Sequence, residues 1–219
     1  MNLIEVIKPQ VFIETPIHGQ KVLQIIERFG RISHKSEDKI GPGTAKIFVE
    51  NLLKMGHESV LEHVSISVRF ICDRGVSHEL VRHRLAAYTQ ESTRYCNYAG
   101  TIKFIKPLFY KKGTEDYQIW YQSCLASAEA YTTLIKRGSK PEEARSVLPN
   151  SLKTEIVSTF NLRQWRHVFK MRCQKAAHPQ IREIMIPTLK RFQKRIPIIF
   201  DDFIIVKNQS LSFPFYLKN

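Results

Sequence analysis

The chain has 219 residues, of which 43% are hydrophobic and 25% are charged. These fractions are typical of a globular protein and exclude a disordered chain or a fibrous repeat. Lys and Arg number 34 against 20 Asp and Glu, so the formal net charge is +14, and residues 151–219 hold most of the excess. This charge indicates an anionic partner (nucleic acid, an acidic membrane or a phosphorylated small molecule) or merely a solvated basic surface.

Several common features are not expected. The sequence has no run of eighteen apolar residues, so we expect no membrane span, and its first ten residues lack the apolar core of a signal peptide. The four cysteines are far apart and form no CxxC pair, which argues against a zinc site and a disulfide framework. We therefore expect a cytoplasmic protein with reduced cysteines and no metal.

The predicted elements form a mixed pattern. Helices are expected over residues 19–29 and 43–55, followed by the clearest strand, 63–73, in which apolar and mostly polar side chains alternate. Next in chain order we expect a strand at 101–105, a helix at 115–136 stopped by Gly138, and a short helix with Pro141 in its first turn. A strand at 153–160, helices at 162–173 and 179–195, and a weak strand at 203–206 follow. Pro187 is a candidate kink within the last helix. No linker divides the chain, so we expect one α/β or α+β domain over residues 1–219, with helices covering a sheet.

A basic cluster follows the first strong strand. We expect a helix with Ser77 as its N-cap and Glu79 in its first turn, running on through Arg82, His83 and Arg84. Three consecutive helical residues cover about 200° of the helix surface, so they cannot share one solvent face while Leu80, Val81 and Leu85 pack inward. Either a cation faces a bound anion or a partner subunit, or the arginines extend to water along their apolar stems.

A polar stretch follows and ends at Arg94, ten residues after Arg84. Its members are Gln90, Glu91, Ser92, Thr93 and Arg94. It is too rich in hydrogen-bonding groups for the middle of a helix, and its amides, hydroxyls and guanidinium group suit a phosphate cradle. Ser92 could instead be a nucleophile, but no serine-hydrolase elbow surrounds it.

A second basic cluster follows the strand at 153–160. Asn161 is a plausible N-cap, and Arg163 and His167 are four residues apart and share a helix face. Arg172 falls on the same stripe as Trp165 and Phe169. It is therefore either a buried or interface ion-pair residue or a fixed cation that faces a ligand; we favour the ligand because an unpaired buried charge is costly.

Four stretches together resemble the flavin-dependent thymidylate synthases. They are His57-Glu-Ser-Val-Leu-Glu-His63; Arg82-His-Arg with Ser92-x-Arg94, which matches the signature RHRxxSxxxxSxR; Arg145-Ser-Val-Leu-Pro149; and Asn161-x-Arg163 with His167 and Met171-Arg172. They span roughly residues 55–185 in the family order. Two positions depart from the family: Ala87 replaces the central serine of the signature, and Ala176 stands where many relatives have a histidine.

The resemblance implies a fold and a reaction. The fold is an α/β subunit with a central, twisted, largely antiparallel sheet flanked by helices, in a homotetramer whose active sites are shared between subunits. The reaction is the reductive methylation of dUMP to dTMP, with 5,10-methylenetetrahydrofolate as the carbon donor and FAD, reduced by NADPH, as the hydride source. No cysteine nucleophile is required, and neither nucleic acid nor a membrane is a partner.

The resemblance also implies roles for individual residues. Arg172 is the catalytic residue, facing the uracil edge and favouring ionised N3. The residues implied for dUMP are Glu79, Leu80, Val81, Arg82, Gln90, Glu91, Ser92, Thr93, Arg94, Arg145 and Arg172. Those implied for FAD are Ser59, Arg82, His83, Arg84, Gln90, Asn161, Leu162, Arg163 and His167, although His167 could instead be a structural histidine.

Two other classes compete with the enzyme. A basic nucleic-acid-binding module without catalytic activity agrees with the high pI and would use residues 163–175 and 190–195. A structural oligomer with a basic surface would explain the helices but not the signature. We expect the ligand-facing arginines to account for part of the charge, and residues 190–195 to be solvated surface.

Overall fold

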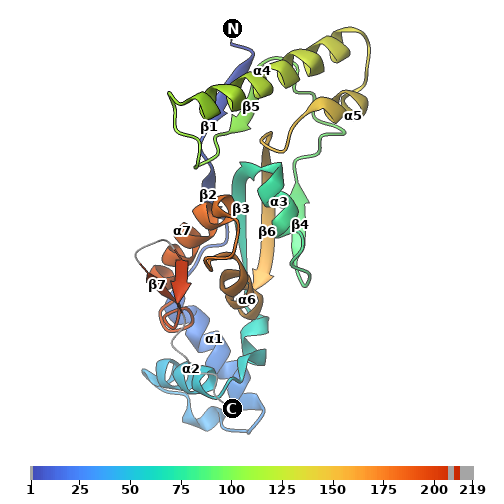
Figure 1. Ribbon diagram of the computed structural model, residues 1–219. Coiled ribbons are helices and arrows are strands. Elements are labelled where there is room, and N and C mark those ends of the chain that lie inside the picture. Colours follow the sequence, from blue (N-terminus) through green and yellow to red (C-terminus); the bar gives the residue numbers. More distant parts are fainter. Residues whose placement is uncertain (1, 207–209, 213–219) are drawn as a thin grey trace. The chain divides into compact units, whose positions relative to one another are not determined.

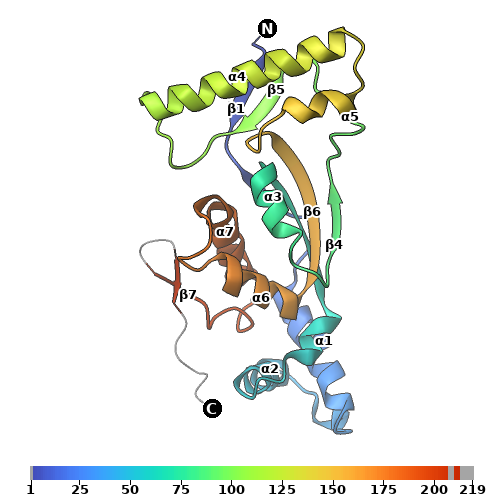
Figure 2. The ribbon, with the colours of Figure 1, turned by 45° about the vertical axis from the view of Figure 1, so that its right-hand side comes forward.

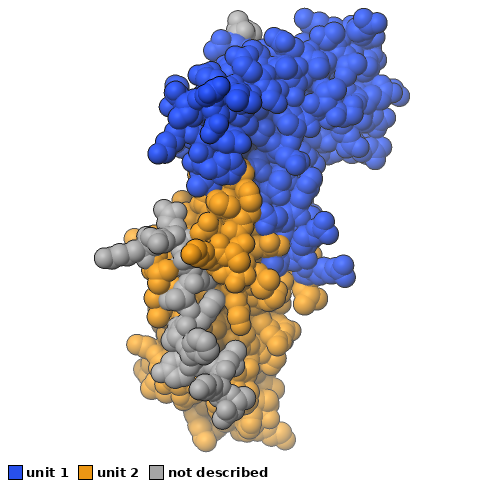
Figure 3. Space-filling view, in the orientation of Figure 1, with its two compact units in different colours: residues 1–12, 69–84, 88–158 blue, residues 13–68, 85–87, 159–219 orange. Residues whose placement is uncertain are grey.

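The computed structural model describes residues 2–206 and 210–212, which form two compact units (Figures 1 and 3). Unit 1 comprises residues 1–12, 69–84 and 88–158, and unit 2 comprises residues 13–68, 85–87 and 159–219. The prediction of one domain over residues 1–219 stays a prediction. Most of the tail from residue 208 onward lies outside the described residues.

Unit 1 contains a small parallel sheet and a long helix. Strands β1 (Ile4–Ile7) and β5 (Ile102–Ile105) pair in parallel, and helix α4 (Glu115–Lys136) packs against them (Figure 2). Thr114 caps α4 by accepting a hydrogen bond from the Tyr117 amide (3.4 Å). The core between them is made of Ile4, Ile102, Phe104, Cys124, Ala128, Tyr131, Ala144 and Leu152. Two short elements, α5 (Pro141–Ala144) and η3 (Arg145–Val147), follow α4.

A four-stranded sheet has the order β2-β3-β6-β4. Its strands are β2 (Gln10–Ile13), β3 (Ser65–Asp73), β4 (Ala87–Gln90) and β6 (Lys153–Asn161). Strands β3 and β6 are antiparallel, because the Leu162 amide donates to the Val64 carbonyl (2.9 Å) while Ser67 and Thr159 join their hydroxyls (2.8 Å). Every second residue of both strands is buried, as the alternation in the sequence predicts.

Unit 2 is mostly helical. It contains α1 (Gly19–Ile32), η1 (Glu37–Lys39), α2 (Thr44–Lys54), η2 (Glu58–His63), α6 (Leu162–Arg172), α7 (Pro179–Arg195) and the antiparallel pair of β7 (Ile204–Val206) and β8 (Ser210–Ser212). An aromatic cluster of Trp165, Phe169, Phe192 and Phe200, all fully buried, fastens α6 to α7. Helix α7 continues through Pro187.

The fold class is confirmed as a mixed α/β arrangement with helices flanking an antiparallel sheet. The expected helices and strands are present with small changes at their ends, except the helix expected from Ser77 through Arg84, which begins and ends earlier. Four short strands were not predicted: β1, β2, β4 and β8. Each has only three or four residues, too few for an alternating pattern to stand out.

Candidate active site

The helix expected to carry the first basic cluster is shorter than predicted. Helix α3 (Arg74–Leu80) begins after Asp73, whose carboxylate accepts a hydrogen bond from the Val76 amide (2.7 Å). Asp73, rather than Ser77, is therefore the N-cap. Ser77 lies inside the helix and is fully buried.

The end of α3 has a clear physical cause. The Tyr88 hydroxyl lies 2.7 Å from the Leu80 carbonyl and 2.6 Å from the His83 carbonyl, so these two acceptors share its single proton where the helix stops. Leu85 then adopts a positive φ of 48°, which cannot continue a right-handed helix, and the chain enters β4.

Arg82, His83 and Arg84 consequently lie in a turn, and the argument that placed them around one helix is wrong. The two arginines are exposed and His83 is 7% exposed. Leu80 is buried as expected, whereas Val81 and Leu85 are 41% and 82% exposed instead of packing inward. The turn thus presents two guanidinium groups outward from a fixed end of α3.

The polar stretch leaves β4 as a turn, as expected. The Gln90 side chain donates to the hydroxyls of Ser77 (2.9 Å) and Thr154 (3.2 Å), both in the interior of unit 1. The Ser92 hydroxyl accepts from the Arg94 amide (3.2 Å), so its own proton is available to a further acceptor. This geometry favours Ser92 as a hydrogen-bond donor.

Two sequence motifs meet in unit 1. Arg145, in η3, donates from Nη1 to the Thr93 hydroxyl over 3.1 Å, although the two residues are 52 positions apart. Arg94 pairs with Glu142 at 3.3 Å, and the two side chains are 55% and 41% exposed. Exposed ion pairs contribute little to stability, so a more strongly charged anion could replace Glu142 as the partner of Arg94.

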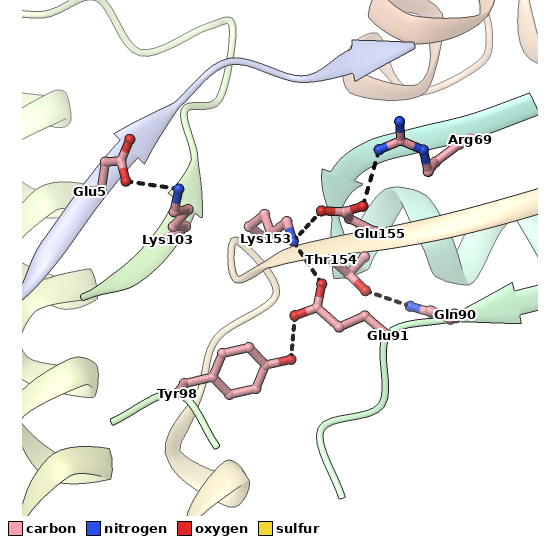
Figure 4. Close-up of polar contacts among 9 residues, drawn as sticks. All are labelled: Glu5, Arg69, Gln90, Glu91, Tyr98, Lys103, Lys153, Thr154 and Glu155. Carbon is pink, nitrogen blue, oxygen red and sulfur yellow. Dashed lines mark hydrogen bonds and ion pairs between the residues drawn. The ribbon is translucent and has the colours of Figure 1, made fainter. Parts of the chain in front are cut away.

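Glu91 is held at both carboxylate oxygens (Figure 4). Lys153 donates to one oxygen (2.8 Å) and the Tyr98 hydroxyl to the other (2.7 Å). Lys153 also binds Glu155 (2.8 Å), which pairs with Arg69 (3.3 Å). Sequence reasoning missed Lys153 and Tyr98, because only the folded chain brings these distant residues to Glu91. It also missed Arg69, which joins the network through Glu155.

Unit 2 carries the second basic cluster on α6. Asn161 caps the helix by accepting from the Gln164 amide (2.8 Å), as predicted. Arg163 and His167 are both exposed, and Arg163 pairs with Glu62 in η2 at 2.6 Å. Ser59, also in η2, is exposed, whereas the Leu162 side chain is fully buried, so Leu162 offers a ligand only its backbone.

Arg172 is the last residue of α6 and is partly exposed. Trp165 and Phe169 on the same stripe are fully buried in the aromatic cluster of unit 2. A cation in the last turn also interacts favourably with the helix dipole. Arg172 is therefore anchored at its backbone by a rigid helix while its side chain reaches the surface of the unit.

Arg166, which the sequence did not single out, is an extensively paired arginine of α6. It binds Glu58 (2.9 Å), Asp202 (2.6 Å) and the Ile199 carbonyl, and it lies over the Phe203 ring. Burial opposes its charge, but the hydrogen bonds and charges of Asp202 and Glu58 outweigh burial and raise the pKa of Arg166. Arg166 fastens η2 and the 199–203 turn to α6, a structural role within unit 2.

Three of the four cysteines are poor nucleophiles here. Cys72, Cys124 and Cys173 are at most 1% exposed, and burial raises the pKa of each thiol. A raised pKa keeps the thiol protonated at neutral pH, and only the thiolate attacks. This finding agrees with the expectation that the reaction requires no cysteine nucleophile.

The expected residues thus form two groups, each within one unit. Unit 1 holds residues 79–84, 90–94 and Arg145, and unit 2 holds Ser59, residues 161–163, His167 and Arg172. Residues 2–206 and 210–212 contain no cluster of three potential metal ligands. Within that same part of the chain, no helix is both long and apolar enough to cross a membrane.

The fold is similar to that of a solved nucleotide methylase. The UMP/dUMP methylase PolB from Streptomyces cacaoi, solved with 5-Br dUMP, superimposes with a TM-score of 0.76 at 21% identity, over 90% of this chain and 95% of that one. Residues 18–198 match the family described as thymidylate synthase complementing protein.

Other relatives have a higher sequence identity to this chain than PolB has. The flavin-dependent thymidylate synthase of Pyrococcus abyssi is 37% identical over 74% of this chain and 68% of its own length, and that of Mycolicibacterium vanbaalenii is 34% identical over 83% and 80%. The chain belongs to the flavin-dependent thymidylate synthases. It is therefore an enzyme, a methyltransferase that uses a flavin, and the resemblance of the four motifs is confirmed.

Proposed function

We propose that this enzyme methylates C5 of dUMP to give dTMP, taking the one-carbon unit from 5,10-methylenetetrahydrofolate and reducing equivalents from NADPH through FAD. The observation that carries the proposal is the 3.1 Å contact of Arg145 with Thr93. It joins the Arg145–Pro149 segment to the loop that begins at Gln90, so cations and hydroxyls from two distant motifs converge as a phosphate requires.

Unit 1 supplies the proposed dUMP groups other than Arg172. Ser92 donates its free proton, Arg94 exchanges Glu142 for the phosphate, and Arg145 adds a second guanidinium group. Gln90, anchored on Ser77 and Thr154, fixes where this loop starts. Glu79, Leu80 and Val81, at the end of α3, complete the proposed surface together with Arg82, Glu91 and Thr93.

Unit 2 supplies most of the proposed FAD groups. Arg163 and His167 project from one face of α6, and the exposed Ser59 lies in η2, to which Arg163 is tied through Glu62. A hydroxyl, a guanidinium group and an imidazole are suitable donors for a pyrophosphate, so this donor set supports a dinucleotide flavin. The proposed set is completed by Arg82, His83, Arg84, Gln90, Asn161 and the backbone of Leu162. When bound, the flavin supplies the hydride.

Arg172 is the proposed catalytic residue. A fixed guanidinium group beside the uracil edge stabilises negative charge at N3 and so raises the electron density at C5, where the new bond forms. The α6 backbone, held by the buried Trp165 and Phe169, restrains the position of this cation. Restraint matters because a charge that is already oriented costs no reorganisation during the reaction.

We further propose that residues 1–219 act as one family domain, in a homotetramer whose active sites are shared between subunits, in the cytoplasm. The exposed arginines of the 82–84 turn agree with a partner or ligand outside their own unit. Size-exclusion chromatography with light scattering tests the assembly, with about four times the 25.6 kDa chain mass expected.

Product formation tests the reaction. Purified enzyme is incubated with dUMP, 5,10-methylenetetrahydrofolate and NADPH, and dTMP is quantified by chromatography. We expect dTMP only when all three are present. Normal dTMP formation without a folate would contradict the assigned carbon donor, and no dTMP from flavin-loaded enzyme would overturn the proposed function.

A further inference from the structure

A carboxylate lies within the proposed phosphate loop. Glu91 stands between Gln90 and Ser92, and its amide donates to the Glu155 carbonyl (2.9 Å), so its backbone is tied to β6. An uncompensated negative charge there would repel an incoming phosphate. The loop can serve an anion only if this charge is neutralised.

We propose that Lys153 is a positioning residue for dUMP: it cancels the charge of Glu91 and holds the 90–94 loop in the shape that accepts the phosphate. This inference rests on the proposed function, because it assigns Lys153 to the same substrate. Lys153 itself need not touch dUMP.

The geometry within unit 1 supports this role. The Lys153 ammonium lies 2.8 Å from both Glu91 and Glu155, and Arg69 lies 3.3 Å from the other oxygen of Glu155. Two cations and two carboxylates thus alternate from β3 across β6 to the start of the loop (Figure 4). The Lys153 and Glu91 side chains are only 16% and 17% exposed, so water screens their charges poorly.

The titration of the neighbouring groups agrees with a permanent pair. Burial opposes the Lys153 charge, but hydrogen bonds to Glu155 and Glu91 outweigh burial and raise the pKa of Lys153. Burial, followed by the hydrogen bond to Glu91, raises the pKa of Tyr98, so its hydroxyl stays protonated and keeps donating.

The alternative is a purely structural ion pair, and four variants separate the two. If the pair only stabilises the fold, Lys153→Met and Glu91→Gln break the same contact and have similar effects on dUMP. If Lys153 neutralises Glu91, Lys153→Met leaves a bare carboxylate in the loop, whereas Glu91→Gln leaves none. The double variant Glu91→Gln/Lys153→Met should then regain affinity for dUMP, and Lys153→Arg should keep it because arginine retains the charge.

The test measures KM for dUMP and kcat on the flavin-loaded enzyme. We expect KM to rise about tenfold or more in Lys153→Met and by a clearly smaller factor in Glu91→Gln and Lys153→Arg, and to fall in the double variant to the value of Glu91→Gln. The rate of flavin reduction by NADPH without dUMP should be unchanged. Lys103→Met, which breaks an ion pair with Glu5 whose side chains are both 49% exposed, is the matched control and should leave KM unchanged.

A second substrate shows whether the Lys153 variant acts through the phosphate of dUMP. Deoxyuridine lacks the phosphate, so the ratio of kcat/KM for dUMP to that for deoxyuridine should fall in Lys153→Met. If Lys153→Met does not fold, Lys153→Gln takes its place with the same expected rise. Equal KM changes in Lys153→Met and Glu91→Gln, or no recovery in the double variant, would overturn the inference. Failure of the wild-type enzyme to make dTMP would instead overturn the proposed function.

Discussion

Arg145 donates to the Thr93 hydroxyl over 3.1 Å and thereby joins a 3-10 turn after α5 to the polar loop after β4. Both are short segments outside the long helices and strands. Their contact fixes one guanidinium group where Ser92 and Arg94 also lie, within unit 1. This relationship leads to the first prediction.

Arg145→Ala should raise KM for dUMP about tenfold or more, because a charge-assisted hydrogen bond to phosphate is lost. Arg145→Lys should fall between the wild type and Arg145→Ala, since lysine keeps the charge without the planar fork. Steady-state kinetics measures both. Arg137→Ala, an exposed arginine just after α4, is the control, and an effect there as large as that of Arg145→Ala would remove the specific role.

Ser92→Ala should weaken dUMP binding about threefold to tenfold and leave measurable turnover, because a donor is lost but no nucleophile. Titration calorimetry with dUMP measures the affinity. Intact-protein mass spectrometry during turnover provides the independent check: a covalent Ser92–nucleotide adduct would refute the assignment of Ser92 as a donor.

Arg172→Ala should retain flavin and lose at least about a hundredfold in dUMP-dependent turnover, because a fixed cation beside the developing charge is removed. The flavin content per chain and kcat are measured on the same preparation. Lys175→Ala, an exposed cation just beyond α6, is the control. A wild-type kcat for Arg172→Ala would contradict the assignment of Arg172 as the catalytic residue.

Arg166→Met should lower the free energy of unfolding by about 3 kcal/mol, since it leaves Glu58 and Asp202 without their buried cation. Urea denaturation followed by the fluorescence of the buried Trp165 reports the change. Lys103→Met, which breaks an exposed pair, should cost less than about 1 kcal/mol. Equal losses would show that Arg166 has no special structural role.

Glu155 should contribute to the acid sensitivity of the fold. The hydrogen bond from Lys153 holds the pKa of the Glu155 carboxyl below its ordinary value of 4.5. The folded state then binds this proton less tightly than the unfolded state, so the stabilisation is present above pH 4.5 and is lost as the pH falls below it. Glu155→Gln should therefore have a shallower acid dependence of unfolding than the wild type, with Glu5→Gln as the control. An unchanged acid slope in Glu155→Gln would contradict the lowered pKa.

Periodic patterns predicted the long elements well, because burial of one face repeats within each of them. The strand ending at Asp73, helix α4 and helix α7 all follow their patterns. The helix end at Leu80 could not be predicted in this way, since Tyr88 caps it from the following strand. The local sequence favoured a longer helix, but the tertiary contact of Tyr88 ends it at Leu80.

The candidate site was predicted more by its motifs than by its contacts. The resemblance supplied the residue types, and the fold supplied the proximity of Arg145 to Thr93. Arg166 and Lys153 were missed because their partners are distant in sequence: Glu58 lies 108 residues before Arg166, and Glu91 lies 62 residues before Lys153. No spacing rule connects such pairs.

The most direct test of flavin-dependent dUMP methylation is the visible spectrum of the purified protein during turnover. We predict a yellow protein whose flavin absorption bleaches when NADPH is added without oxygen. The absorption should return, with stoichiometric dTMP, only after both dUMP and 5,10-methylenetetrahydrofolate are supplied. A colourless protein that FAD does not reconstitute, and that shifts DNA in a gel, would contradict the account and favour a nucleic-acid-binding module.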